Sequence, residues 1–192
     1  MTMIKLIVGL GNPGPRYAST RHNAGAWFIE ELATQQRLSL RLDKKFQMEW
    51  AEYPSANHKI FIAKPITFMN ESGIAVAAFA QFYQIDPSEI LVVHDELDFQ
   101  AGEVKLKSGG GHGGHNGLRD ILARMGAADF YRLRVGIGHP GQAAQVVSYV
   151  LHPPTLDEKI EIDRAIYRAT KVLPDLLAGE IAKAMKDLHT EA

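Results

Sequence analysis

The side chains in this sequence that are best suited to moving a proton are a histidine and an aspartate. His22 lies in a polar turn that follows the apolar run 4–10, and Asp95 stands in the acidic stretch that follows the apolar run 89–93. Such runs indicate buried strands, and open α/β sheets place their chemistry at the carboxyl ends of such strands, so we expect the two side chains to meet. In such a pair the carboxylate fixes the tautomer of the imidazole, and the free ring nitrogen takes a proton from water. A lone histidine in a loop is more often simply exposed, and the residues alone leave both interpretations of His22 open.

Three asparagines supply neutral amides for the same chemistry. Asn12, Asn70 and Asn116 could orient a water molecule, a substrate amide or a developing oxyanion. Asn70 beside Ser72 could simply cap a helix, and on the residues alone this structural interpretation is the leading one. The chain has no cysteine and no G-x-S-x-G elbow, so no covalent nucleophile is evident. One base with neutral amides suits hydrolysis of an activated ester, whereas a peptide amide would call for a metal or a covalent nucleophile.

A glycine-rich loop precedes a predicted helix. Six of the nine residues in 109–117 are glycine, and the others are His112, His115 and Asn116. Such a loop lets the backbone pass close to a ligand, and its ordered amides can meet negative charge. Flexible linkers favour glycine with serine and rarely carry histidine and asparagine, so we expect a binding site here rather than a linker.

Two other patterns point to different functions, and neither is well supported. Residues 9–14 match G-x-G-x-x-G, but prolines interrupt the expected helix start, and no acidic residue ends a strand where a dinucleotide ribose would be bound. A metal site could combine His94 and Asp95 with the two histidines of the glycine loop. Their spacing is loose, and glycine loops hold ligands poorly without supporting contacts. We therefore expect no metal and no cofactor.

Charge is unevenly distributed along the chain. The 192 residues carry a formal net charge of -1 and are 46% apolar, which suits one well-buried α/β domain without a global basic field. Residues 103–137 nevertheless hold six basic side chains against three acidic ones. Lys105 and Lys107 alternate with apolar residues and so share one face of a predicted strand, and residues 132–135 repeat the pattern. Both pairs could be ordinary solvated faces, but two basic pairs that flank a glycine loop better fit a clamp for phosphates.

The rest of the sequence predicts alternating strands and helices, which indicates an α/β fold with residues 1–192 in a single domain. We expect strands at 4–10, 46–53, 59–64, 89–93, 103–107 and 132–135, and helices at 26–36, at about 73–83, from 118, at 155–177 and at 179–189. No apolar run approaches the length of about 18 residues that spans a membrane, and the sequence begins without a signal-peptide pattern. We therefore expect a soluble, cytoplasmic protein with no membrane association.

Five stretches of the sequence closely resemble, in order and spacing, the motifs of bacterial peptidyl-tRNA hydrolases. The most specific are Tyr17-x-x-Thr20-Arg21-His22-Asn23-x-Gly25 and Gly111-x-x-x-His115-Asn116-Gly117-Leu118-Arg119-Asp120, and the others are residues 9–14, 67–70 and 94–98. The resemblance covers about residues 4–152. It implies a monomeric, single-domain α/β fold with a twisted, mixed, mostly parallel β-sheet flanked by helices. It also implies an enzyme that cleaves the ester between the peptide and the terminal ribose of peptidyl-tRNA, releasing tRNA for reuse, without a metal, a covalent intermediate or an obligate protein partner.

The same resemblance implies roles for individual residues. His22 matches the catalytic base of the family, Asp95 the carboxylate that orients it, and Asn12 an amide that positions base and substrate. The implied substrate-binding residues are Tyr17, Met69, Asn70, Gly113, His115 and Asn116, and the implied tRNA-binding residues are Lys105, Lys107 and Arg134. No role follows for His94, His112 or the residues beyond 155.

Two questions about function remain at this point: how such an enzyme would distinguish its substrates, and whether the chain is a catalyst or only binds RNA. Asparagine amides can pair with the C=O and N–H of a peptide, whereas a protonated amine would set donor against donor. Asn70 and Asn116 would in this way let the enzyme spare aminoacyl-tRNA. A non-catalytic RNA-binding relative would keep the fold and the basic patch, but it would not need the intact set of base, carboxylate and amides.

Overall fold

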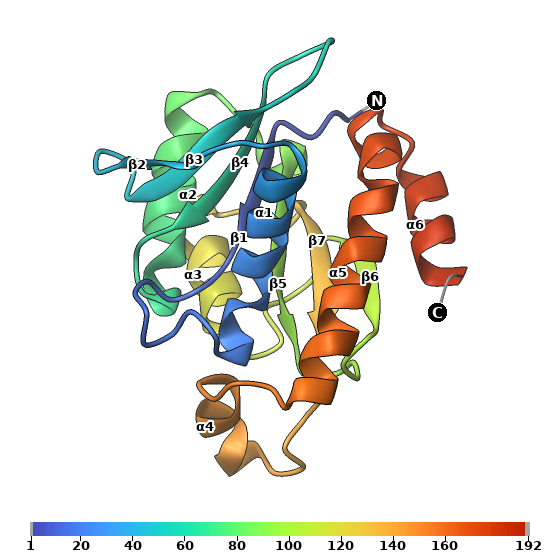
Figure 1. Cartoon of the computed structure of the whole chain (residues 1–192). Helices are drawn as coiled ribbons and strands as arrows, with labels where there is room; N and C mark the ends of the chain where they lie inside the picture. The colour runs from blue at the N-terminus through green and yellow to red at the C-terminus, as the bar shows by residue number, and fades with distance from the viewer. Residues whose placement is uncertain (1, 191–192) are drawn as a thin grey trace.

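A seven-stranded mixed β-sheet forms the centre of the molecule in the computed structural model, which describes residues 2–190 (Figure 1). The strand order is β2-β3-β4-β1-β5-β7-β6. The four central strands run parallel, and they are β4 (Ile60–Pro65), β1 (Leu6–Gly9), β5 (Ile90–Glu96) and β7 (Tyr131–Gly136). Antiparallel strands complete the edges, namely β2 (Arg41–Asp43) and β3 (Met48–Tyr53) on one side and β6 (Val104–Ser108) on the other. The predicted α/β class with a mixed, mostly parallel sheet is confirmed, although the short strand β2 was not predicted.

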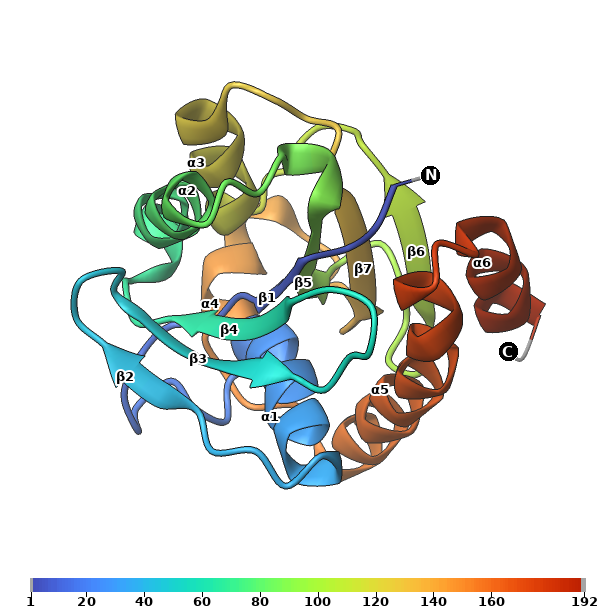
Figure 2. The same cartoon turned by 90° about the horizontal axis from the view of Figure 1, so that it is seen from above.

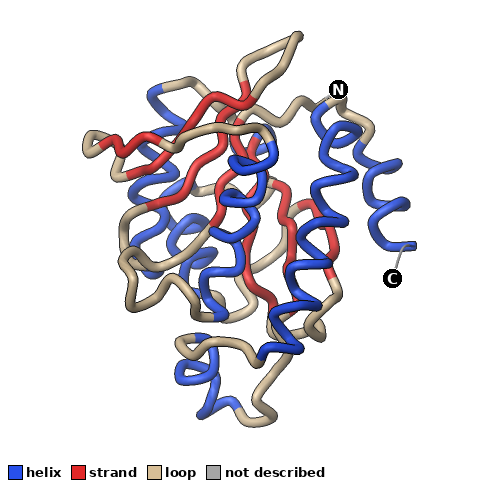
Figure 3. Tube along the Cα trace, in the orientation of Figure 1, coloured by secondary structure: helices blue, strands red, loops and turns tan. Residues whose placement is uncertain are grey.

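Helices cover both faces of this sheet (Figure 2). One face carries α1 (Ala24–Gln35) and α5 (Leu156–Leu177), and the other carries α2 (Ser72–Phe82) and α3 (Asn116–Met125). The last helix, α6 (Ile181–Thr190), packs against α5 and the edge strand β6. The short helix α4 (Val146–Val150) lies apart from these layers, at the end of the molecule toward which the arrows of β5 and β7 point in Figure 1. In the same orientation, Figure 3 shows that loops join it to the rest of the chain.

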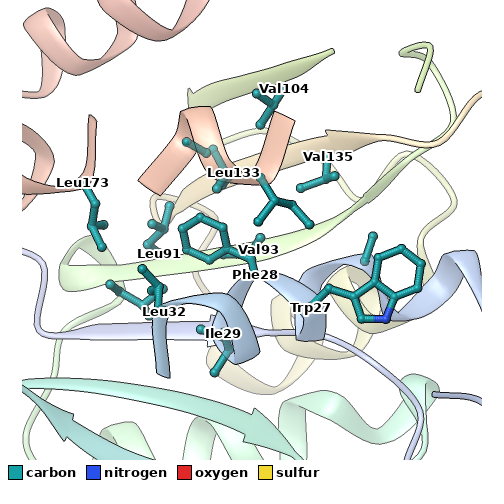
Figure 4. Packing of buried hydrophobic residues seen from close by; sticks show 14 of the residues in the cluster. Trp27, Phe28, Ile29, Leu32, Leu91, Val93, Val104, Leu133, Val135 and Leu173 are labelled. Atoms are coloured by element: carbon teal, nitrogen blue, oxygen red, sulfur yellow. The ribbon is translucent and has the colours of Figure 1, made fainter. Parts of the chain in front are cut away.

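Two hydrophobic cores hold these layers together. Phe28 and Leu32 of α1 pack with Leu91 of β5 and Leu173 of α5 on one side of the sheet (Figure 4). The opposite core includes Phe79 of α2 together with the α3 side chains that face the sheet. The central strands are buried on both faces, which explains why their sequences are continuous apolar runs. The sheet is therefore a rigid base for the loops at its carboxyl end.

Two glycines bring the start of α1 against the ends of β1 and β5. A Cβ atom at Gly9 would lie 2.1 Å from the carbonyl oxygen of Gly25, and one at Gly25 would lie 2.2 Å from the carbonyl oxygen of Val93. No side chain fits at these distances, so only glycine permits the approach. The close packing places the turn before α1 beside the end of β5, and thereby His22 beside Asp95.

The helices nearest the site begin earlier than predicted. A 3-10 turn, Arg21–Asn23, leads into α1 at Ala24, and α3 begins at Asn116 rather than at 118. Asn23 stands at the N-cap of α1, but its side chain does not cap the helix; it exchanges two hydrogen bonds with the backbone of Asn12. The other predicted helices agree to within about two residues, the usual uncertainty of a helix end, and α4 was not predicted.

Candidate active site

The imidazole of His22 and the carboxylate of Asp95 meet at the carboxyl end of β5. Nδ1 of His22 lies 3.0 Å from Oδ1 and 2.9 Å from Oδ2 of Asp95, and both side chains are buried. The structure thus brings together the two groups that the sequence places after neighbouring strands. Because Nδ1 donates to the carboxylate, Nε2 is the nitrogen of His22 that remains for a reactant.

A second histidine shares the same carboxylate. Nε2 of His115 lies 2.8 Å from Oδ1 of Asp95, while its Nδ1 accepts hydrogen bonds from the backbone N–H groups of Gly117 (3.1 Å) and Leu118 (3.3 Å). His115 is therefore the N-cap of α3, where it satisfies backbone donors that the helix leaves free. Since Nδ1 accepts, the proton must be on Nε2, from which it is donated to Asp95. No pattern in the sequence predicts this contact, because the two residues are distant in the chain and histidine is not a usual N-cap.

The negative charge of Asp95 dominates the electrostatics of the site. Burial by itself raises the pKa of the Asp95 carboxyl, but His22 and His115 outweigh burial and hold that pKa below its ordinary range. Burial also lowers the pKa of His22, but the adjacent carboxylate reverses this effect and leaves the His22 pKa above its ordinary value. The site therefore keeps a fixed anion beside an imidazole that is a stronger base than in water, as proton abstraction requires.

His94, which precedes Asp95 in the chain, is buried beside the site and contacts the backbone of Asp95. Its Nδ1 donates to the backbone carbonyl of Asp95 at 2.8 Å, and its ring lies 5.1 Å from that of His115. Complete burial, together with the neighbouring His115, lowers the pKa of His94 to about 3. The ring is therefore neutral at physiological pH and does not compete with His22 as a base.

The metal-ligand set considered from the sequence is not assembled. His112 accepts a hydrogen bond from the N–H of Gly114 at 2.9 Å within its own turn. Among residues 2–190, the group of side chains with metal-ligand spacing is instead His22, Asp95 and His115, whose ligand atoms lie within 4.8 Å of one another. Two N–H···O hydrogen bonds already account for this closeness, so a metal would have to displace both protons.

A cleft of about 340 Å³ opens over this group. Its floor is polar and its rim is apolar. The residues that line it are Asn12, Tyr17, His22, Phe68, Met69, Asn70, Asp95, Glu96, Leu97, Gly113, Gly114, His115, Asn116, Val146, Val147, Val150 and Leu151. All nine residues that the sequence assigns to catalysis or substrate binding are among them. A polar centre within apolar walls is typical of a small-molecule or peptide site.

The three asparagines line the cleft in different ways. Oδ1 of Asn12 accepts from the backbone N–H of Met69 at 2.7 Å, which leaves the amide nitrogen of Asn12 to donate to a ligand. Oδ1 of Asn116 accepts from Arg119 at 3.1 Å, so its amide nitrogen is likewise a donor. Asn70 is exposed at the cleft and does not cap α2, since Glu71 occupies the N-cap position without a side-chain bond. Asn12 and Asn116 therefore present amide N–H donors to the cleft, and Asn70 adds a third carboxamide from a separate segment.

Close packing fixes the walls around these amides. A Cβ at Gly117 would lie 2.6 Å from Sδ of Met69, so the glycine lets the start of α3 contact this wall. On the outer side, Tyr17 meets Phe68 edge to face with ring centroids 6.3 Å apart. Gly113, also in the wall, has φ +56, which favours glycine.

The predicted basic residues lie beside the cleft, on the far side of the glycine loop. Lys105 and Lys107 are exposed on one face of β6, and Lys105 pairs in register with Arg134 of β7. Arg134 forms an ion pair with Glu96, with N···O distances of 2.7 Å and 2.6 Å. Another cavity, of about 230 Å³, is lined by Lys107, Arg134 and the glycine loop, and also by the carboxylates of Glu96 and Asp98. Cations, a hollow and loop amides form a setting that suits a phosphate.

Arg132 has a structural role within this basic group. It is buried, and its guanidinium donates to the carbonyl oxygens of Gly110 and Gly111. It thus anchors the glycine loop to β7, rather than extending into solvent as an exposed basic face would. The sequence pattern alone could not distinguish this arginine from Arg134.

The wall of the cleft that helix α4 forms was not predicted from the sequence. Helix α4 and the residue after it contribute Val146, Val147, Val150 and Leu151 to the lining. Val147 is 67% exposed, an unusual value for valine in a helix. The apolar spacing in 146–151 was the available signal, but five residues are too few to establish a helical period.

Comparison with known proteins identifies the family of the chain. The family model described as Peptidyl-tRNA hydrolase matches residues 6–192. The peptidyl-tRNA hydrolase of Coxiella burnetii is 54% identical over 187 residues (97% of this chain and 98% of that protein), and that of Neisseria meningitidis serogroup A is 53% identical over 188 residues (98% of each). A crystal structure of the peptidyl-tRNA hydrolase from Acinetobacter baumannii has a TM-score of 0.95 at 45% identity and covers 99% of this chain and 97% of that one. The fold, the motifs and these matches together place the chain in the peptidyl-tRNA hydrolase family.

Proposed function

We propose a mechanism by which this member of the family hydrolyses peptidyl-tRNA, with His22 as general base. A water molecule held at Nε2 of His22 attacks the carbonyl carbon of the ester. Its proton passes to Nε2, and the ester bond then breaks as the ribose oxygen takes up that proton. Asp95 stays ionised and stabilises the imidazolium that forms in between. The observation that carries this proposal is the buried His22–Asp95 contact of 2.9 Å at the floor of the cleft.

The asparagine amides supply the electrophilic half of the mechanism. Asn12 and Asn116 each have their carboxamide oxygen occupied by a protein donor, so each directs N–H groups toward the cleft. Such donors can stabilise the oxyanion that develops on the ester carbonyl. Because they are already oriented by the protein, little reorganisation is needed when the charge appears.

The two products of hydrolysis would leave from opposite sides of the site. The apolar lining formed by Phe68, Met69 and α4 suits the peptide, and Lys105, Lys107 and Arg134, on β6 and β7, suit the phosphates of tRNA. The ester would then lie over His22, between the two surfaces. We propose that the chain works as a monomer in the cytoplasm, with residues 1–192 as one domain and peptidyl-tRNA as its sole obligatory partner.

We further propose that Asn70 and Asn116 discriminate between substrates. Their N–H donors pair with the carbonyl of a peptide bond, whereas the ammonium of free aminoacyl-tRNA would place donors against donors. If Asn70→Ala and Asn116→Ala both kept full discrimination between N-blocked and free aminoacyl-tRNA, this part of the proposal would be wrong.

The decisive experiment measures tRNA release from N-blocked and from free aminoacyl-tRNA. We expect the intact protein to cleave the blocked substrate alone, with no effect of a chelator. His22→Ala should be nearly inactive, whereas His139→Ala, at an exposed turn outside the cleft, should match the parent protein. Loss of activity on chelation would favour a metal-dependent hydrolase. Salt-dependent tRNA binding without cleavage would indicate a non-catalytic binding protein.

A further inference from the structure

Arg21, the residue before the proposed base, is a buried cation that does not enter the cleft. It is 7% exposed, and the carbonyl oxygens it meets belong to a distant segment. Its backbone N–H donates to the carbonyl of His152 at 3.1 Å, and its Nη1 donates to the carbonyls of Tyr149 (3.1 Å) and His152 (3.4 Å). The guanidinium also lies on the ring of Tyr149, with Cζ 3.9 Å from the centroid. Both the backbone and the side chain of Arg21 thus hold the residues around the end of α4.

Helix α4 depends on such external contacts. A helix of five residues has hardly any internal hydrogen bonds, and its last carbonyls need partners from elsewhere. Arg21 supplies donors and positive charge at that end, where both are favourable. The hydroxyl of Tyr149 adds one further anchor by donating to the carbonyl of Ile137 at 2.6 Å.

The carboxylate of Glu158 connects Arg21 to helix α5 as well. Nη2 of Arg21 lies 2.9 Å from Oε2 of Glu158, in the first turn of α5. The same oxygen accepts from the backbone N–H of Thr155 at 2.8 Å, as part of the capping box that starts α5. Arg21 therefore joins three elements: the turn that carries His22, the end of α4 and the start of α5.

We infer that Arg21 is a positioning residue that holds α4 against the cleft at a fixed distance from His22. The apolar side chains that α4 contributes, Val147 among them, form one wall of the cleft. Without Arg21, α4 would leave its place at the cleft for part of the time. Substrates that contact α4 would then bind only to the fraction of protein molecules in which this wall is in place. The inference rests on the proposed placement of the peptide along α4, and it makes Arg21 a determinant of affinity for longer peptides.

The test compares Arg21→Lys with Arg164→Lys on two substrates. Lysine keeps the charge but lacks the planar fork that reaches two carbonyls and a carboxylate together. Arg164, an exposed arginine paired with Glu161 on α5, is the matched control. For a tRNA carrying an N-acetylated tripeptide, we expect Arg21→Lys to raise KM about tenfold and to change kcat less than about twofold. For N-acetyl-aminoacyl-tRNA, whose acyl group is too short to reach far along α4, KM should change much less.

Two further readouts separate positioning from a general loss of stability. Hydrogen exchange should speed up at the amides of 146–152 and stay unchanged in the central strands. The pH profile of kcat/KM should keep its position, because the His22–Asp95 pair is untouched. If KM rises equally for both substrates, or if kcat falls while KM holds, Arg21 does not act through α4 and the inference is overturned.

A second variant keeps the test valid if Arg21→Lys does not fold. Glu158→Gln removes the charge that faces Arg21, while glutamine still serves in the capping box. It should shift KM for the long substrate in the same direction. Unchanged KM and unchanged exchange in this variant would refute the inference. Failure of the proposed mechanism itself would look different, since His22→Ala would then remain active.

Discussion

Replacing Asp95 by asparagine tests how the site fixes the tautomer of its base. Oδ1 of Asp95 accepts from His115 at 2.8 Å and also lies 3.0 Å from Nδ1 of His22, whereas Oδ2 accepts from His22 alone, at 2.9 Å. Asparagine has one carboxamide oxygen, so an NH₂ group takes the place of one of the two acceptors and brings a donor against whichever histidine it faces. Since Nδ1 of His115 is occupied by the backbone donors of Gly117 and Leu118, His115 cannot change its own tautomer at low cost. The oxygen of the asparagine should then face His115, and its NH₂ group should face Nδ1 of His22.

This orientation would put the His22 proton on the wrong nitrogen. Nδ1 would become an acceptor and Nε2 would carry hydrogen, so the ring could not take a proton from water. We expect kcat on N-acetyl-aminoacyl-tRNA to fall about a thousandfold, which corresponds to about 4 kcal/mol in the activation free energy. KM should change little, because the cleft walls remain. The assay is single-turnover release of tRNA, with ¹⁵N chemical shifts of the His22 ring to report the tautomer and Asp163→Asn, an exposed surface carboxylate, as the control.

A double variant makes the prediction more specific. With His115→Ala added to Asp95→Asn, the asparagine is free to turn its oxygen toward His22, which restores the productive tautomer. The double variant should therefore be about tenfold more active than Asp95→Asn alone, although the lost N-cap costs about 1 kcal/mol of stability. A double variant less active than the single one, or an Asp95→Asn variant with kcat within about tenfold of the parent protein, would show that this account of the shared carboxylate is incorrect.

Three further predictions follow from the same geometry. Because Asp95 raises the pKa of His22, kcat/KM should decline on the acid side at a pH above the ordinary imidazole value of about 6.5, as the base becomes protonated; a midpoint below that value would contradict the raised pKa. Gly25→Ala would place a Cβ 2.2 Å from a carbonyl oxygen of β5, so it should lower the free energy of unfolding by roughly 2 kcal/mol or more. Denaturant titration measures this change, and an unchanged unfolding midpoint would show that the backbone shifts at little cost. Lys107→Ala should weaken tRNA binding and reduce the slope of log K against log salt by about 1, whereas Lys171→Ala on α5 should not.

The sequence predicted the fold well where a local pattern reports burial. Continuous apolar runs mark β1 and β5 because these strands are covered on both faces. The apolar periodicity of residues 155–177 predicted the helix α5, which in the structure begins with a capping box of Thr155 and Glu158. The short elements β2 and α4 were missed because three to five residues carry no measurable period and owe their form to tertiary contacts.

The site was predictable where it follows from topology and not where it depends on side-chain geometry. His22 and Asp95 follow parallel strands in the sequence, so both were expected at the carboxyl ends of the strands. The contact between His115 and Asp95 joins residues 20 positions apart through an N-cap, and no local pattern encodes it. The likeness of Arg132 to Arg134 in sequence likewise conceals that one is buried under the glycine loop while the other lies at its edge.

The position of Asp95 links the chemistry of the cleft to its architecture. Its carboxylate receives a donor from the turn before α1 and another from the N-cap of α3, so one charge holds the two elements that carry His22 and Asn116. Because the folded-state pKa of Asp95 is depressed, the stability this charge contributes is present above the unfolded-state pKa and is lost as pH falls through the folded one. The His22 pKa is shifted the other way, so the base is protonated at a much higher pH than the carboxylate. Acid should therefore switch off catalysis first, in a cleft that is still intact, and disorder the cleft only at far lower pH.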